Sequence, residues 1–108
     1  MKPRSSRTRT LVEAPNVSGM SDTTWLLMAR YRGLPLIPIE TVCADYFRHL
    51  TPEALIRKVS AGEIALPLVR IEASQKSAKS VHINDLAQWL DDRAEAARKK
   101  CHQLCRQL

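Results

Sequence analysis

The side chains in this sequence with the clearest chemical potential are cations and small hydrogen-bond donors between residues 48 and 79. The guanidinium of Arg57 can bind guanine through two hydrogen bonds, whereas the ammonium of Lys58 is a point charge suited to phosphate. These residue types indicate binding to duplex DNA. The candidate contacts are Arg48, His49, Thr51, Glu53, Arg57, Lys58, Arg70, Ser74, Gln75, Lys76, Ser77 and Lys79.

Each part of this set also has a structural interpretation. Arg57 and Lys58 also suit the solvated face of an amphipathic helix, and residues 73–80 have the composition of any solvated hairpin loop. Arg70 fits either a phosphate contact or an ion pair with Glu72. The choice depends on the elements that position these side chains.

The spacing of the histidines, cysteines and glycines predicts no catalytic site and no metal-binding site. His82 has no acidic or thiol partner at a diagnostic distance in sequence, which is typical of a structural histidine. Cys101, His102 and Cys105 lie close together with Cys43 far away, and no Cys-x-x-Cys pair supports a zinc site. With only three glycines there is no phosphate-binding glycine loop. We therefore expect no enzymatic activity, no cofactor and no metal.

Composition favours a polyanionic partner. The 108 residues suffice for one domain, and 17 Lys and Arg against 11 Asp and Glu give a formal net charge of +6. One Phe, two Tyr and two Trp leave few rings for stacking on single strands, so duplex DNA fits better. The chain shows no signal-peptide core and an odd number of cysteines, from which we expect a cytoplasmic, nucleoid-associated protein.

Two segments precede the first well-marked helix. Residues 1–22 carry four basic groups and no periodicity, which predicts a disordered basic tail, and Met20 is an alternative native start. Residues 25–31 favour a helix capped by Asp22 or Thr23, and Gly33 would end it. Residues 34–38 are then expected to be extended because of their two prolines.

A helix-turn-helix is predicted next. Apolar residues recur at helical spacing from Ile39 to Phe47, and a second helix from Pro52 to about Ala61 is marked by Thr51 as N-cap and Gly62 as C-terminal signal. In such a motif the second helix enters the major groove. Arg57 and Lys58 would then face the DNA.

Residues 68–72 and 81–83 predict two strands joined by the loop 73–80, a hairpin wing. Asn84 would cap the last helix, whose Leu86, Trp89 and Leu90 complete the core. The expected fold is mainly α with a small β-hairpin. It is a winged helix-turn-helix DNA-binding domain over residues 23–90, with a C-terminal helical extension over 91–108.

The extension carries apolar residues at heptad spacing, which predicts a homodimer. The residues of this seam are Leu90, Ala94, Ala97, Cys101, Leu104 and Leu108. Two alternatives remain open: the helix packs back on its own domain, or Lys99 and Lys100 contact DNA.

Several stretches of this sequence resemble the pyocin activator protein PrtN family. The stretches are Leu-Leu-Met-Ala-Arg-Tyr at 26–31, Ile-Pro-Ile-Glu-Thr-Val-Cys-Ala-Asp-Tyr-Phe at 37–47, Leu-Pro-Leu-Val-Arg at 66–70, Ser-Gln-Lys-Ser at 74–77 and Val-His-Ile-Asn-Asp-Leu-Ala at 81–87. The resemblance covers roughly residues 24–100. More loosely, the order of elements is similar to the winged modules of the MerR and excisionase groups.

The resemblance implies a small bacterial transcriptional activator of bacteriocin or prophage genes that binds promoter DNA, with RNA polymerase as a possible partner. The alternatives are an excisionase-like architectural protein that bends DNA, and an adaptor that uses its C-terminal helix to bind another protein.

Overall fold

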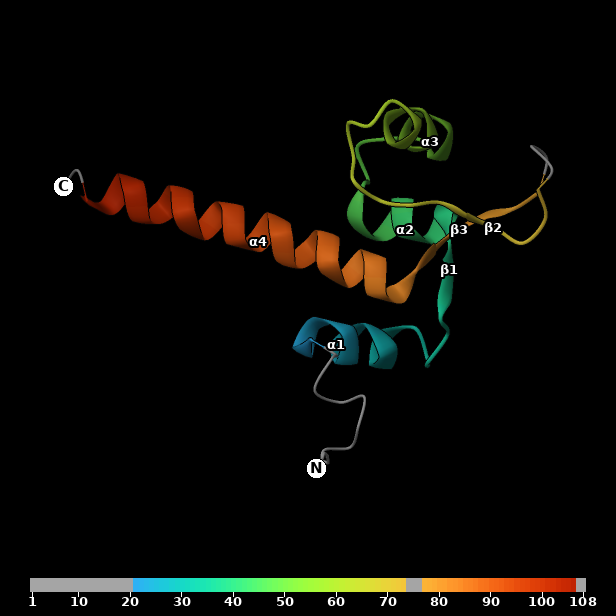
Figure 1. Cartoon of the computed structure of the whole chain (residues 1–108), viewed down its shortest axis with the longest axis horizontal. Helices are drawn as coiled ribbons and strands as arrows, with labels where there is room; N and C mark the ends of the chain where they lie inside the picture. The colour runs from blue at the N-terminus through green and yellow to red at the C-terminus, as the bar shows by residue number, and fades with distance from the viewer. Residues whose placement is uncertain (1–20, 74–76, 107–108) are drawn as a thin grey trace, which may run out of the picture.

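Short helices and a small sheet surround the start of one long helix (Figure 1). The computed structural model describes residues 21–73 and 77–106. In chain order its elements are α1 (Asp22–Arg30), β1 (Leu36–Pro38), α2 (Ile39–Tyr46), α3 (Pro52–Ser60), β2 (Val69–Arg70), β3 (Lys79–His82) and α4 (Ile83–Arg106). None of these helices is long and apolar enough to cross a membrane.

The sheet is larger than the predicted hairpin. Its three strands are antiparallel in the order β1-β3-β2, so the extended segment around Pro35 and Pro38 contributes a strand as well. Ile37 pairs with Val81 at its centre, and both side chains are buried. Pro38, which has no N–H to donate, is tolerated because β1 is an edge strand. The predicted mainly α fold is confirmed, and the small hairpin is corrected to a three-stranded sheet.

The predicted strand bounds also change. β2 covers only Val69–Arg70 instead of 68–72, because it pairs only with Lys79 and Ser80 of β3. Ile83 was expected to end the last strand but begins α4, and its amide donates to the carbonyl of Pro35 at 2.8 Å.

The two central helices lie within one residue of their predicted bounds. The side chain of Thr51 accepts a hydrogen bond from the Ala54 amide at 3.1 Å, and Gly62 has φ +80°, so both predicted end signals of α3 are confirmed. Between the helices, the thiol of Cys43 donates to the carbonyl of Leu50 at 3.1 Å. This contact ties the turn to α2.

The core lies where α1, α2, α3 and α4 meet the sheet. Leu55 of α3 and Leu86 of α4 are fully buried, and Trp89 and Leu90 pack against the buried cluster, as predicted. The buried apolar residues are Leu27, Tyr31, Ile37, Ile39, Val42, Cys43, Phe47, Leu55, Leu66, Val81, Ile83, Leu86 and Ala87.

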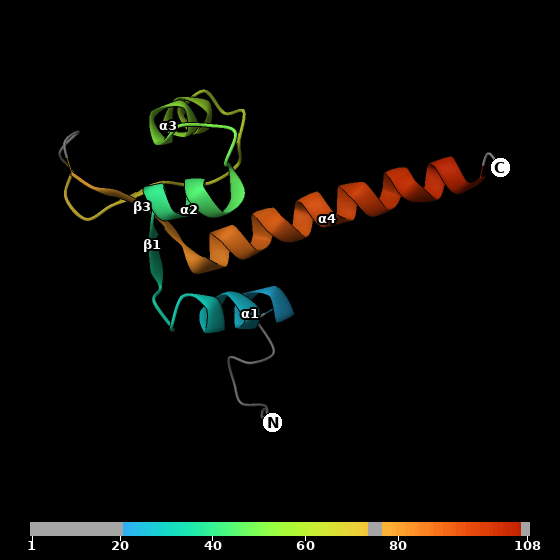
Figure 2. The same ribbon diagram turned by 180° about the vertical axis from the view of Figure 1, so that it is seen from behind.

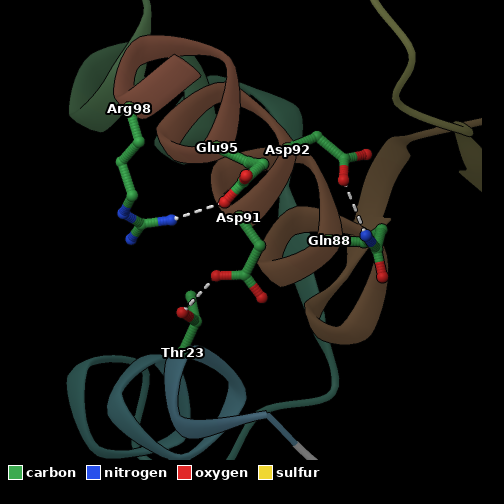
Figure 3. Close-up of polar contacts among 6 residues, drawn as sticks. All are labelled: Thr23, Gln88, Asp91, Asp92, Glu95 and Arg98. Carbon is green, nitrogen blue, oxygen red and sulfur yellow. Dashed lines mark hydrogen bonds and ion pairs between the residues drawn. The ribbon is translucent and has the colours of Figure 1, made fainter. Parts of the chain in front are cut away.

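The α1 helix lies along the first half of α4. Its N-cap is Ser21, whose hydroxyl oxygen accepts from the Thr24 amide at 3.1 Å, and not Asp22 or Thr23 as predicted. Thr23 instead donates to the carboxylate of Asp91 at 2.5 Å, which joins the two helices (Figure 3). Asp22 therefore belongs to the helix and not to the predicted tail, of which residues 1–20 lie outside the described residues.

The long helix continues as the heptad pattern predicted, but it begins differently. Asn84 is not its cap: the Asn84 amide donates to Nδ1 of His82 at 3.0 Å, because the helix starts directly at Ile83. His82 is thus a structural histidine, as expected. Figure 2 shows, like Figure 1, that α4 extends past α1 and away from the other elements.

Candidate nucleic-acid interface

The outer face of α3 carries one prominent cation. Leu55 is fully buried, so Arg57, about 200° further round the helix, points away from the core and is exposed. Ala54 and Ala61 lie beside it on the same face. Within the described part of the chain, Arg57 has no ion-pair partner. The guanidinium, together with Ala54 and Ala61, lines an open hollow on this face of α3 and can therefore reach a ligand there.

Lys58, the next residue, forms an ion pair within the protein. Nζ of Lys58 lies 3.2 Å from a carboxylate oxygen of Glu63, just beyond the end of the helix. Both side chains are well exposed, so this ion pair contributes little to stability and can be exchanged for a phosphate contact. Glu53, also predicted as a contact, is exposed in the first turn of α3. Its negative charge there interacts favourably with the positive end of the helix dipole.

The turn before α3 is firmly anchored. The centroid of the Phe47 ring lies 5.0 Å from that of Trp89 on α4 and 6.4 Å from that of His49. Arg48 and His49 are exposed beside this anchor, as a contact to DNA requires. Thr51 uses its oxygen as the cap of α3, which leaves its hydroxyl proton to donate.

The pairing of β2 with β3, the strands of the predicted wing, places two cations opposite each other. Arg70 of β2 and Lys79 of β3 are direct partners in the antiparallel register, so their side chains leave the same face of the sheet. No ion pair joins Arg70 to Glu72 among the described residues. The exposed guanidinium of Arg70 is therefore available to an anion.

The rest of the predicted wing is described only in part. The hydroxyl of Ser77 donates to the carbonyl of Glu72 at 3.0 Å, which closes the two sides of the loop. Ser74, Gln75 and Lys76 lie outside the described residues, as does Leu108 of the heptad seam. The strand β2 lies on the side of the molecule opposite the free end of α4 (Figure 1).

One carboxylate of the central unit is held by contacts with the end of α1. Asp45 of α2 accepts from the hydroxyl of Tyr31 at 2.5 Å and pairs with Arg30 at 3.1 Å. The Tyr31 hydrogen bond and then the Arg30 cation hold the pKa of Asp45 below its usual value, whereas burial and then Asp45 raise the pKa of Tyr31. The Arg48 cation also lowers the pKa of Asp45, so this carboxylate is electrostatically coupled to the turn before α3 as well as to the end of α1.

The structure adds two features that the sequence analysis missed. Cys43 fixes the turn through its thiol, and only the strand register places Arg70 against Lys79. A β-strand pattern gives no register by itself, so no local signal could have found the second feature. The described residues contain no cluster of three or more metal-binding side chains.

Comparisons with known proteins give one match. The family described as Pyocin activator protein PrtN matches residues 23–97, which include all of α1 but its first residue, α2, α3, the sheet and α4 as far as Ala97. No curated protein and no solved structure matches the chain.

Proposed function

This chain belongs to the pyocin activator protein PrtN family, and from that premise we propose that it is a sequence-specific DNA-binding activator of bacteriocin or prophage genes. In this proposal α2 and α3 form a helix-turn-helix, and β2 and β3 form a wing. The observation that carries it is the outer face of α3, where exposed Arg57 stands between small side chains.

The α3 helix suits the major groove. The alanines at 54 and 61 let its backbone approach the base edges closely, and Arg57 is long enough to reach guanine O6 and N7. One such two-bond contact discriminates against a wrong base by about 1 to 3 kcal/mol. Arg48 and Lys58, on either side of this contact along the chain, suit the phosphates that border the groove.

The wing suits the DNA backbone. A phosphate would accept a charge-assisted hydrogen bond from the exposed guanidinium of Arg70, and the side chain of Lys79 leaves the same face of the sheet. Phosphate contacts carry no sequence information, so the wing adds affinity and α3 supplies the preference. Lys76 at the predicted tip would add a further contact of the same kind.

The test begins with the full chain and a pool of random duplexes, from which bound sequences are selected. We expect a defined sequence to be enriched, with an affinity for it at least about 10³ above that for random duplex. Arg57→Ala should lower this ratio by about tenfold, the scale of one lost base contact. Arg93→Ala removes the same charge from exposed α4 and should leave the ratio unchanged.

The proposed phosphate contact of the wing is tested with a second variant. Arg70→Ala should weaken binding to selected and random duplexes alike, and reduce the slope of log K against log salt by about 1. Selection that enriches no sequence would refute specific activation. Strong bending of every duplex tested would then point to an architectural role instead.

A further inference from the structure

The second half of α4 is a helix face that the rest of the described chain leaves uncovered. The α1 helix joins α4 at Asp91, and residues 95–106 are all exposed (Figures 1 and 2). A helix segment of this length is only marginally stable in water without packing. In the described residues its side-chain support includes one ion pair, from Glu95 to Arg98 at 3.2 Å (Figure 3).

One side of this segment is apolar. At about 100° per residue, Ala94, Ala97, Cys101, Leu104 and Cys105 fall within one sector of the helix, here called the distal stripe. The sulfur atoms of Cys101 and Cys105 lie 4.0 Å apart, and Leu104 is 55% exposed. Exposed apolar residues in a continuous row are typical of a surface that another helix covers.

The borders of the distal stripe are basic. Arg93 and Lys100 lie along one border and Arg98 along the other. The nearest acidic group on the uncovered segment, Glu95, lies beyond Arg98 and is paired with it. A helix docked on the stripe would therefore meet positive charge on both sides.

Charge argues against covering by a second copy of this chain. In a parallel pair, Arg93 would face Arg98 of the second copy, and in an antiparallel pair centred on the stripe, Lys100 would face Lys100. Residues 1–20 would also be repelled by the basic borders of the stripe, because they contain four basic residues and one acidic residue. Duplex DNA would satisfy the cations but leave the apolar stripe in water.

We propose that the distal stripe binds an amphipathic helix of another protein, one with apolar residues at heptad spacing flanked by Asp and Glu. Its apolar side chains cover the alanines and Leu104, and its carboxylates pair with Arg93, Arg98 and Lys100. Specificity then comes from the attraction of unlike charges and the repulsion between like copies. This surface is separate from the α3 face and the wing.

The test uses the full chain and two synthetic three-heptad peptides that share leucines at the stripe-facing positions. One peptide carries Glu at the flanking positions and the other carries Lys. We expect the Glu peptide to bind at least about tenfold more tightly in low salt, with the difference shrinking as salt screens the charges. Fluorescence anisotropy of labelled peptide measures both affinities.

A matched pair of variants separates the stripe from general charge. Ala97→Lys puts a charge into the stripe and should abolish binding of the Glu peptide. Ala96→Lys makes the same change on the neighbouring exposed position outside the stripe, and should leave binding intact or stronger. The double change Arg93→Glu with Lys100→Glu should shift the preference toward the Lys peptide.

Three results would overturn the proposal. The first is equal binding of both peptides. The second is sedimentation of the protein alone as a dimer that Ala97→Lys dissociates, which would assign the stripe to a second copy. The third is a loss of DNA affinity in Ala97→Lys but not in Ala96→Lys. DNA selection with the wild-type chain is scored separately, so failure of the DNA-binding proposal would not be mistaken for failure of this one.

Discussion

At the scale of single residues, Asp45 shows how one carboxylate holds α1 to α2. It takes a hydrogen bond from Tyr31 and an ion pair from Arg30, and both contacts favour its ionised form. Because its folded pKa is lowered, its stabilising contribution is present above the unfolded pKa, about 3.9, and is lost as pH falls through the lower folded value.

Replacing this carboxylate should therefore cost stability at neutral pH and less in acid. Asp45→Asn is expected to lower the free energy of unfolding by about 1 kcal/mol at pH 7, the scale of a partly exposed charged hydrogen bond. The difference from wild type should narrow at pH 3. Urea unfolding at both pH values measures it, with Asp92→Asn on exposed α4 as the control. A difference that is equal at both pH values would contradict the assigned role.

The three thiols should differ sharply in reactivity. Burial, with a smaller contribution from Glu53, raises the pKa of Cys43, and its thiol donates inside the turn. Cys101 and Cys105 are exposed. A disulfide reagent such as Ellman's should titrate two thiols quickly and the third only on unfolding. Rapid reaction of all three in the native protein would mean that the turn is not held as described.

At the scale of elements, the sequence predicted α2 and α3 well because their signals are local. Amphipathic spacing, Thr51 before Pro52 and Gly62 after the helix are all contained in a few residues. The sheet was missed in part because Ile37 and Val81 are far apart in sequence and pair only through the tertiary fold. The start of α4 was misplaced because Asn84 is a common cap, whereas histidine rarely signals one.

The role of His82 at this junction can be tested directly. His82→Ala removes the acceptor for the Asn84 amide and should lower the free energy of unfolding by about 1 kcal/mol. His82→Asn supplies a side-chain oxygen near the position of Nδ1 and should restore most of the lost free energy of unfolding. The urea midpoints of the two variants report the comparison. Equal losses in both would show that ring packing, and not the cap, matters at this position.

At the scale of the whole molecule, placement of charge matters more than its total. Residues 25–90 hold eight basic and six acidic groups, so the central unit is nearly neutral. Its candidate contacts could be named as residue types because the sequence predicted the helix α3 and the strands β2 and β3 near their observed places. The position of Arg70 opposite Lys79 could not be predicted, since it follows only from the register of β2 and β3. Tertiary structure thus brings together basic side chains that are nine residues apart in the sequence.

The two proposed surfaces should separate when the chain is cut after Asp92. The cut removes five basic residues and one acidic residue, so the formal net charge falls from +6 to +2. It keeps the buried Leu86 and the contact between Thr23 and Asp91, and the folded unit should therefore remain. Affinity for random duplex should fall in low salt because fewer cations attract the phosphates, while the preference for the selected sequence persists.

The same truncated chain should no longer bind the Glu peptide, because Ala97, Cys101 and Leu104 are absent. Circular dichroism confirms folding, and parallel titrations with peptide, selected duplex and random duplex measure the three affinities. A tenfold loss of sequence preference, together with a change from dimer to monomer in sedimentation, would instead make α4 the element that pairs two DNA-binding units. The repulsion between Arg93 and Arg98 across such a pair argues for the first outcome.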